Sequence, residues 1–362
     1  MILQNIWHRP IRTVVCVLAV GIEVGMVMLV VGLTHGMLHD SATRVEGVGA
    51  DIMVQPPNSS YFLGLTSAPM PVAIANRLQQ LPHVRAVTPV LFQFESAHGL
   101  SLIWGIDMKT WNQVTGGFVY REGGPFQGPY DVLVDDWYAR AEKIKVGDPV
   151  NLLNHVFKVS GIVMHGKGGR LFIPLTTADN LAEQEDRASA FFIKCTDPGY
   201  TQAVIQSAET LLPKYTVRSV QEYMSMMTSN DIPAMTDFNA VLIAVAVIIG
   251  FLIIFLSMYT TVTERTREVG ILKSLGASKG YIMEVVLKEA WLLSALGVVT
   301  GYLIAWLGRK VMVTVFPTLT VELTVQWALI AGVLALAGAL LGALYPALRA
   351  ARLDPIEALA YE

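Results

Sequence analysis

One short segment of this chain has the residue types of a metal site. His35 and His39 lie four residues apart, with Asp40 adjacent, and this spacing would place two imidazole rings on one face of a helix. Imidazole nitrogens and carboxylate oxygens are common zinc ligands. No third ligand with matching spacing is visible in the sequence. Polar residues near a membrane surface are therefore the competing interpretation, and we expect no metal site here.

A second candidate is a phosphate-binding loop. Residues 161–167 match the first part of the pattern GxxxxGK, in which backbone amides and a lysine hold phosphate groups. Gly168 stands where the pattern requires serine or threonine, and Gly169 and Arg170 lead into a β-like run instead of a helix. Without a helix N-terminus the loop lacks the amide donors and the dipole that bind phosphate. We interpret the segment as a hairpin turn and expect this chain itself to bind no cofactor.

Hydrolytic motifs are missing from the sequence, which contains neither HExxH nor a nucleophile elbow. We therefore expect a chain that is not itself an enzyme, with no catalytic residues.

One ionisable residue, Glu23, lies inside an apolar segment. A charge in the middle of a membrane helix costs about 2.5–3.5 kcal/mol on insertion scales, which apolar neighbours can offset. Three interpretations stay open: a polar site in the membrane that serves substrate or gating, an interhelical hydrogen bond, or a helix shifted so that Glu23 lies nearer the surface.

The elements that position these residues follow from composition. The chain has 362 residues, of which 53% are hydrophobic and 15% are charged, whereas soluble proteins carry about 25% charged residues. The net charge of −3 gives no basic excess for binding nucleic acid. Cys16 and Cys195 lie far apart, and Cys16 falls in an apolar segment, so we expect no disulfide.

Four apolar segments, residues 13–34, 238–263, 290–308 and 323–348, can each supply the roughly 20 residues that a helix needs to cross a bilayer of about 30 Å. The alternative for the first segment is a cleaved signal peptide, because basic residues precede it. Its apolar core exceeds the roughly 7–15 residues of a signal peptide, and no clear A-x-A cleavage site follows. We therefore predict four retained membrane helices.

Basic residues near the segment ends predict the orientation, because short loops rich in lysine and arginine stay in the cytoplasm. If every segment crosses once, most of these residues fall on one side, and only Arg309 and Lys310 oppose them. Both termini and residues 264–289 are then cytoplasmic, and residues 35–237 lie outside. The residues on the cytoplasmic side are Arg9, Arg12, Arg265, Arg267, Lys273, Lys279, Lys288, Arg349 and Arg352.

The large segment 35–237 is long enough for a folded core of its own. Runs of β-branched and aromatic residues predict strands, and amphipathic runs predict helices. The glycines between 116 and 124 predict a division into two lobes near residues 120–130. The predicted strands are 51–54, 86–94, 102–106, 131–134, 150–153, 157–163, 171–174 and 191–195, and the predicted helices are 72–81, 137–144 and 201–212.

The predicted fold class is therefore an α-helical membrane protein. It has four transmembrane helices, with a large α+β extracytoplasmic domain between helices 1 and 2. The domain boundaries are 1–34 for the N-terminal flank and helix 1, 35–237 for the α+β domain, 238–263 for helix 2, 264–289 for a cytoplasmic elbow, 290–348 for helices 3 and 4, and 349–362 for a cytoplasmic tail.

The elbow, residues 264–289, carries both charges and an apolar face. Val269, Leu272 and Leu275 fall near one side of a short helix, Gly276 ends it, and Ser278 can cap the next one. Because both ends join membrane helices, a push on the elbow would move both of them. Two pairs of opposite charge at a spacing of three residues support the short helix: Glu264 with Arg267, and Arg265 with Glu268.

Small residues recur at a spacing of four in three of the apolar segments, and such residues allow close approach of membrane helices. We assign them to packing, either within one chain or between two. They are Gly21 with Gly25, Gly297 with Gly301, and Gly338 with Gly342.

The C-terminal end repeats the theme of the elbow. Residues 345–352 end the fourth segment, and residues 353–359 predict a second short helix with Asp354 at its start and Pro355 at its first turn.

Residues 263–278, which read TERTREVGILKSLGAS and are followed by Glu289 and Ala290, resemble the signature of FtsX/MacB-type (type VII) ABC permeases. The ending 345–359 and the layout, one span, a large domain and then three spans, are similar to that family as well. The resemblance is specific over roughly residues 235–362 and looser towards the N-terminus, where residues 132–150 are similar to the family's outer-domain core.

The resemblance implies several partners. They are a separate cytoplasmic ABC ATPase that binds Mg-ATP, a second permease copy in a homodimer or heterodimer, membrane lipids and, in some members, a periplasmic adaptor with an outer-membrane duct. No nucleic acid is implied. It places coupling to the ATPase at Glu264, Arg265, Arg267, Glu268, Gly270, Lys273, Gly276 and Ala277.

The function that the resemblance implies is export or extraction of a lipophilic, amphipathic or peptide substrate at the bacterial cytoplasmic (inner) membrane. ATP hydrolysis in the cytoplasm would drive this by mechanotransmission. The substrate would be expelled on the outer side without crossing the membrane through a central channel. The alternative is an ATP-driven regulator that activates an envelope partner and transports nothing. A lipid-sized groove between dimer partners would favour export, and a sealed interface would favour signalling.

Overall fold

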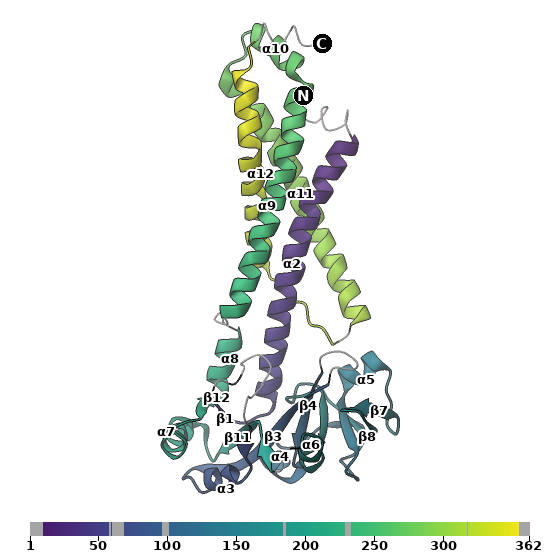
Figure 1. The fold of residues 1–362 in the computed structure, drawn as a ribbon, viewed down its shortest axis with the longest axis vertical. Helices are drawn as coiled ribbons and strands as arrows, with labels where there is room; N and C mark the ends of the chain where they lie inside the picture. Colours follow the sequence, from purple (N-terminus) through teal and green to yellow (C-terminus); the bar gives the residue numbers. More distant parts are fainter. Residues whose placement is uncertain are drawn as a thin grey trace. The chain divides into compact units, whose positions relative to one another are not determined.

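The computed structural model describes residues 10–57, 59, 69–95, 101–183, 186–228, 233–316 and 318–354. Residue contacts divide the chain into two units (Figure 1). The helical unit comprises Met1–His35, Pro233–Val315 and Val321–Glu362, and the α+β unit comprises Gly36–Ile232 and Phe316–Thr320. The predicted short helix at 353–359 lies largely outside the described residues, which end at Asp354.

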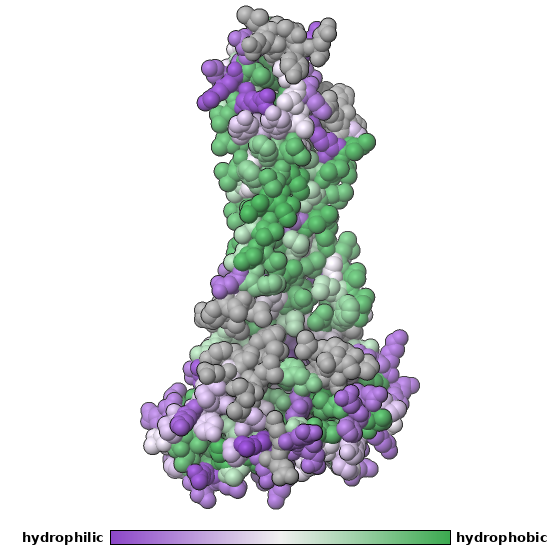
Figure 2. All heavy atoms as spheres, viewed as in Figure 1, coloured by the Kyte–Doolittle hydropathy of each residue, from purple (hydrophilic) through white to green (hydrophobic). Residues whose placement is uncertain are grey.

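Four long helices form the helical unit: α2 (Pro10–Gly47), α9 (Pro233–Glu264), α11 (Lys279–Val315) and α12 (Val325–Arg352). Each contains a stretch long and apolar enough to cross a membrane, which confirms the four predicted spans. Figure 2 shows apolar side chains covering the visible sides of these helices. Helix α2 extends beyond the predicted segment because Leu38, Ala42 and Val45 are buried in the core of the α+β unit.

Glycines bring the helices of the helical unit close together. Gly21 and Gly25 of α2 face Gly297 and Gly301 of α11, and a Cβ atom built on Gly301 would lie 2.6 Å from the Cβ atom of Val24. In α12, Gly342 lies against α9 backbone, where a Cβ atom would be 2.7 Å from the Phe251 carbonyl oxygen; Gly338 faces Val247 of α9. The predicted role in packing is confirmed, and these contacts lie within one chain.

The α+β unit is built on a ten-stranded mixed sheet with the order β12-β1-β11-β3-β4-β9-β6-β8-β5, in which β7 also pairs with β8. The pairs β4–β9 and β6–β8 are parallel and the other pairs are antiparallel. The strands are β1 (Ile52–Gln55), β3 (Val84–Glu95), β4 (Ser101–Ile106), β5 (Tyr120–Gly123), β6 (Asp131–Asp135), β7 (Pro149–Leu152), β8 (His155–Val163), β9 (Leu171–Pro174), β11 (Ala190–Cys195) and β12 (Thr216–Ser219). A small separate sheet pairs β2 (Met70–Pro71) with β10 (Arg187–Ala188).

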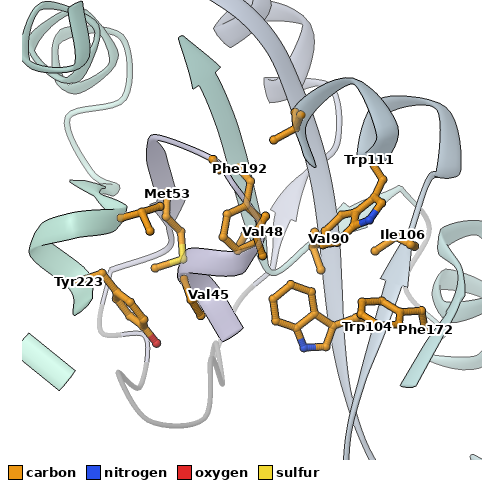
Figure 3. Packing of buried hydrophobic residues seen from close by; sticks show 14 of the residues in the cluster. Val45, Val48, Met53, Val90, Trp104, Ile106, Trp111, Phe172, Phe192 and Tyr223 are labelled. Carbon is orange, nitrogen blue, oxygen red and sulfur yellow. The ribbon is translucent and has the colours of Figure 1, made fainter. Parts of the chain in front are cut away.

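Alternation along the strands divides the buried side chains between the two faces of the sheet. One face carries a single core that includes Trp104, Trp111, Phe172 and Phe192 and receives the end of α2 through Val45 (Figure 3). The opposite face carries two separate cores, one near β1 and β11 and the other near β6, β8 and β9. The sheet therefore crosses the predicted boundary near residues 120–130, and the halves are separate only on one face.

Helices cover the sheet at the places that the sequence predicts and at three others. The predicted helices correspond to α3 (Ile74–Gln79), α5 (Asp136–Glu142) and α7 (Thr201–Leu211), and η1 (Pro198–Tyr200) is a short turn before α7. The additional helices are α4 (Met108–Thr115), α6 (Leu175–Leu181) and α8 (Val220–Thr228).

Candidate functional site

The elbow has the predicted helix-turn-helix form. Helix α9 ends at Glu264, α10 (Thr266–Ser274) follows, and α11 begins at Lys279 (Figure 1). Gly276 has a φ of +94°, a left-handed conformation that glycine adopts without steric cost.

Two hydrogen bonds stabilise the turn. The Gly276 N–H donates to the Lys273 carbonyl and the Ala277 N–H donates to the Leu272 carbonyl, both at 3.0 Å. This pair of bonds is a Schellman motif. The Oγ atom of Ser278 accepts from the Tyr281 N–H at 3.2 Å and caps α11, as predicted.

One side of α10 is packed against the ends of the long helices. Val269, Leu272 and Ala277 contact a small core formed by Val262 of α9, Ile282 of α11 and Ala350 of α12. Because three long helices contribute to this core, a displacement of α10 would also displace the ends of these helices.

The opposite side of α10 is open to solvent. Arg267 and Glu268 are exposed, Ile271 is 44% exposed and Leu275 is 80% exposed. Their spacing of three and four residues places them on one face. The prediction that Leu275 shares a face with Val269 and Leu272 is wrong, because Leu275 is exposed on the open side whereas Val269 and Leu272 contact the small core. We name Arg267, Glu268, Ile271 and Leu275 the elbow stripe.

Lys273, predicted to couple to an ATPase, is used within the chain. Its Nζ atom donates to the carbonyl oxygens of Ala351 at 3.0 Å and Leu353 at 2.5 Å. These carbonyls lie at the C-terminal end of α12, where a cation also interacts favourably with the helix dipole. Gly270 is buried in α10. The predicted coupling residues therefore separate into an exposed group and a group that holds the elbow together.

The predicted ion pairs of the elbow are wrong: in the described chain, neither Glu264–Arg267 nor Arg265–Glu268 forms. Arg265 lies in the turn between α9 and α10, so these residues do not follow one helical spacing. Instead, Arg265 Nη1 lies 3.9 Å from Glu289 Oε2 of α11.

Glu289 also forms an ion pair with Arg12, which the sequence did not predict to be part of the elbow. Arg12 Nη2 lies 3.4 Å from Glu289 Oε1 and Arg12 Nη1 lies 3.9 Å from Glu264 Oε2. The Glu289 side chain is only 5% exposed. This cluster connects α2, the α9–α10 turn and α11. The signal in the sequence was a carboxylate at the start of an apolar segment, where a charge requires a partner.

Glu23 lies between α2 and α9. It is buried, and a Cβ atom built on Gly250 of α9 would overlap its Oε2 atom. The missing side chain of Gly250 therefore makes room for the carboxyl group. No hydrogen bond or ion pair reaches Glu23 from any residue that the structure describes, so an interhelical hydrogen bond is not observed there.

The two candidate ligand sites of the sequence are not formed. The His35 ring packs at 5.7 Å from Trp327, and the described residues contain no group of three potential metal ligands. Lys167 of the GxxxxGK segment donates from Nζ to the carbonyl oxygens of Thr115 and Gly117. Its amine is committed to backbone carbonyls. The predicted hairpin turn is wrong, because the segment connects β8 and β9, which lie on either side of β6 and pair with it instead of with each other.

Comparison with known proteins decides the family. A family described as MacB-like periplasmic core domain matches residues 13–211, more than half of the chain. The chain belongs to the FtsX/MacB-type family of ABC permeases. A second family, FtsX-like permease C-terminal, matches residues 240–355, which include the whole elbow.

Two of the curated relatives of this FtsX/MacB-type permease are similar along nearly its whole length, and a third over a shorter part. The macrolide export ATP-binding/permease protein MacB of Sodalis glossinidius is 24% identical over 98% of the chain and 59% of the relative. MacB of Hahella chejuensis is 25% identical over 98% of the chain and 58% of the relative. The ABC transporter permease YknZ of Bacillus subtilis is 33% identical over 35% of the chain and 32% of the relative. The chain thus spans less than two thirds of the length of these relatives.

Among solved structures, the periplasmic region of MacB from Actinobacillus actinomycetemcomitans matches with a TM-score of 0.40 and 16% identity, over 51% of this chain and 96% of that one. The extracellular domain of the YknZ transporter matches with a TM-score of 0.38 and 14% identity, over 47% of this chain and 98% of that one.

Proposed function

We propose that this chain supplies the permease of an ABC transporter whose ATPase binds Mg-ATP and docks on the elbow. ATP-driven movement of the elbow displaces the membrane helices and the α+β unit, and a substrate is exported or extracted on the outer side by mechanotransmission. The observation that carries the proposal is α10, which has one side packed on α9, α11 and α12 and the other side exposed.

The elbow stripe suits a protein partner. Leu275 and Ile271 offer apolar area, and a side chain such as leucine contributes about 1.5–3 kcal/mol when it becomes fully buried. Arg267 and Glu268 add two opposite charges beside these apolar side chains, and such charges favour one orientation of a partner. An exposed leucine beside a fixed glycine turn gives the partner a rigid contact, so little conformational entropy is lost on docking.

The orientation and the remaining partners belong to the same proposal. Basic residues near the helix ends favour a cytoplasmic elbow in a bacterial inner membrane, with both termini on the same side. A second permease copy completes the transporter, and an adaptor with an outer-membrane duct would extend it. The relatives named as macrolide export proteins support a lipophilic or amphipathic substrate, and a permease role supports a chain that is not itself catalytic.

The test is association with the ATPase. The tagged full chain is purified from its own membranes, and vanadate-sensitive ATP hydrolysis of the preparation is measured. We expect ATP hydrolysis by the double variant Arg267→Glu and Leu275→Asp to be at least tenfold lower than that of wild type. The variant removes an apolar contact and reverses a charge of the elbow stripe.

The matched control is Arg77→Glu, an equal charge reversal at an exposed residue of α3 in the α+β unit. A preparation of this variant should contain the ATPase and hydrolyse ATP at the wild-type rate. Equal hydrolysis by the elbow variant and the control would remove the docking site from the elbow stripe.

A further inference from the structure

Four charged side chains of the α+β unit form a charge quartet: Asp40 and Arg44 of α2, Asp135 before α5, and Arg170 before β9. Arg44 Nε and Arg170 Nη2 both lie 3.1 Å from Asp40 Oδ2. Arg170 Nη1 lies 3.6 Å from Asp135 Oδ2. All four side chains are 1% to 22% exposed. Two arginines balance two aspartates, so the quartet is neutral as a whole.

Arg170 is the member that reaches a third segment. Its Nη2 atom donates at 2.9 Å to the carbonyl oxygen of Thr318, in the connection between α11 and α12. Thr320 of the same connection donates from Oγ1 to the Gly36 carbonyl at 2.7 Å. The Arg170 guanidinium also lies 5.4 Å from the ring centre of Trp137 in α5. One side chain therefore contacts α2, the α11–α12 connection and the start of α5.

The Asp135 side chain also holds α5 in place. Its Oδ1 atom accepts from the Tyr138 N–H at 2.6 Å and caps α5. Burial raises the pKa of Asp135, and the positive charge of Arg170 acts in the opposite direction. Without Arg170 the carboxylate would lose a compensating charge, so the cap of α5 depends on the arginine.

Such a cluster is a poor way to gain stability alone. Removing charges from water costs several kcal/mol for each ion, and apolar residues of similar volume are often equally stable. Charge pairs differ from apolar packing in their directionality: they fix the relative placement of the segments that carry them. In this cluster, those segments are α2, the connection between α11 and α12, and the residues before α5 and β9 of the α+β unit.

We propose that Arg170 is a positioning residue that transmits displacement of α2 and of the α11–α12 connection to α5 and β9 of the α+β unit. This inference rests on the proposed function, because the displacement originates at the ATPase. Arg170 contacts neither substrate nor nucleotide in this scheme. Its loss uncouples the α+β unit from ATP hydrolysis without releasing the ATPase.

The experiment measures hydrogen exchange in the purified full chain with its ATPase, with and without a non-hydrolysable ATP analogue. In the wild-type complex, the analogue should change the exchange of α5 and β9. In Arg170→Met the change should fall at least fivefold, whereas ATPase copurification and ATP hydrolysis stay within twofold of wild type. Arg170→Lys, which keeps the charge but not the fork of donors, should fall between them.

The second variant is Asp40→Asn, which keeps the shape of the side chain and removes one charge of the quartet. It should also reduce the response of α5, and it decides the matter if Arg170→Met does not fold. The matched control is Arg77→Met, with a wild-type response. An undiminished response in Arg170→Met or in Asp40→Asn would overturn the inference alone. A wild-type preparation without an ATPase would overturn the proposed function and the inference with it.

Discussion

Neighbouring charged residues of the elbow have different surroundings and therefore different roles. Arg267 is exposed on the elbow stripe, whereas Lys273, six residues later, donates to carbonyls at the end of α12. A charge-assisted hydrogen bond to a buried or half-buried group contributes about 1.5–3 kcal/mol, whereas an exposed charge contributes little to folding. Variants of Lys273 should therefore lower stability, and variants of Arg267 should affect association.

Asp179 provides a pH-dependent prediction at the residue scale. Burial raises its pKa to about 6, against a hydrogen bond from the Arg187 N–H that lowers it, and Asp186 adds to the rise. A raised carboxylate pKa means that the folded state holds the proton more tightly. Its contribution to stability is therefore complete below the ordinary pKa and is lost as the pH rises through about 6.

The expected result is measured with Asp179→Asn, which stays neutral at every pH and keeps an oxygen for the Arg187 N–H. From pH 4 to pH 7, the unfolding free energy of the variant should rise relative to wild type by on the order of 1–3 kcal/mol. Denaturant titrations of both proteins at several pH values give this difference. A difference that does not vary with pH would show that Asp179 has an ordinary pKa in the folded protein.

At the scale of elements, the contact between α2 and α11 depends on the absence of side chains. Gly21 and Gly25 meet Gly297 and Gly301, so backbone packs on backbone. Without a hydrophobic driving force between helices in lipid, such close packing supplies much of their association. The Arg12–Glu289 pair then fixes the register of α2 at the elbow end of the same contact.

We expect Gly301→Ala to destabilise the helical unit. The new Cβ atom would lie 2.6 Å from the Cβ atom of Val24 and 2.9 Å from the Gly21 carbonyl oxygen, and overpacking typically costs about 1–3 kcal/mol. Thermal unfolding of the detergent-solubilised protein measures the change as a lower midpoint.

Gly280→Ala is the control on the same helix. The nearest atom to its Cβ position is Ser278 Oγ at 3.9 Å, and alanine favours the helix by about 1 kcal/mol over glycine. A lower midpoint for Gly280→Ala than for Gly301→Ala would refute the packing argument.

At the scale of the whole molecule, the proposal requires the elbow and the α+β domain to lie on opposite sides of the membrane. Four helices that are long and apolar enough to cross a membrane, with the large domain between α2 and α9, are consistent with this arrangement. In this proposal the bilayer separates the ATPase from the α+β domain, and the membrane helices carry the movement between them.

Cysteine labelling of intact cells tests the orientation. Leu275→Cys and Tyr200→Cys introduce thiols at exposed positions of the elbow and of the α+β unit. A membrane-impermeant maleimide should label the Tyr200 variant in intact spheroplasts and the Leu275 variant only after permeabilisation. Wild type is the background control, because Cys16 and Cys195 are buried. Labelling of the Leu275 variant in intact spheroplasts would reverse the topology.

The four membrane segments, the α+β domain and the turn of the elbow were predictable from the sequence. Apolar length, strand alternation and the pair Gly276 and Ser278 are local signals, because they depend on neighbours along the chain. The partners of individual side chains were not predictable in this way. Leu275 is exposed, Lys273 caps α12, Glu289 meets Arg12, and Arg170 joins three segments. The contacts of Lys273, Glu289 and Arg170 join residues that are distant in the sequence, so only the tertiary structure decides which charges are buried together and which stay free for a partner.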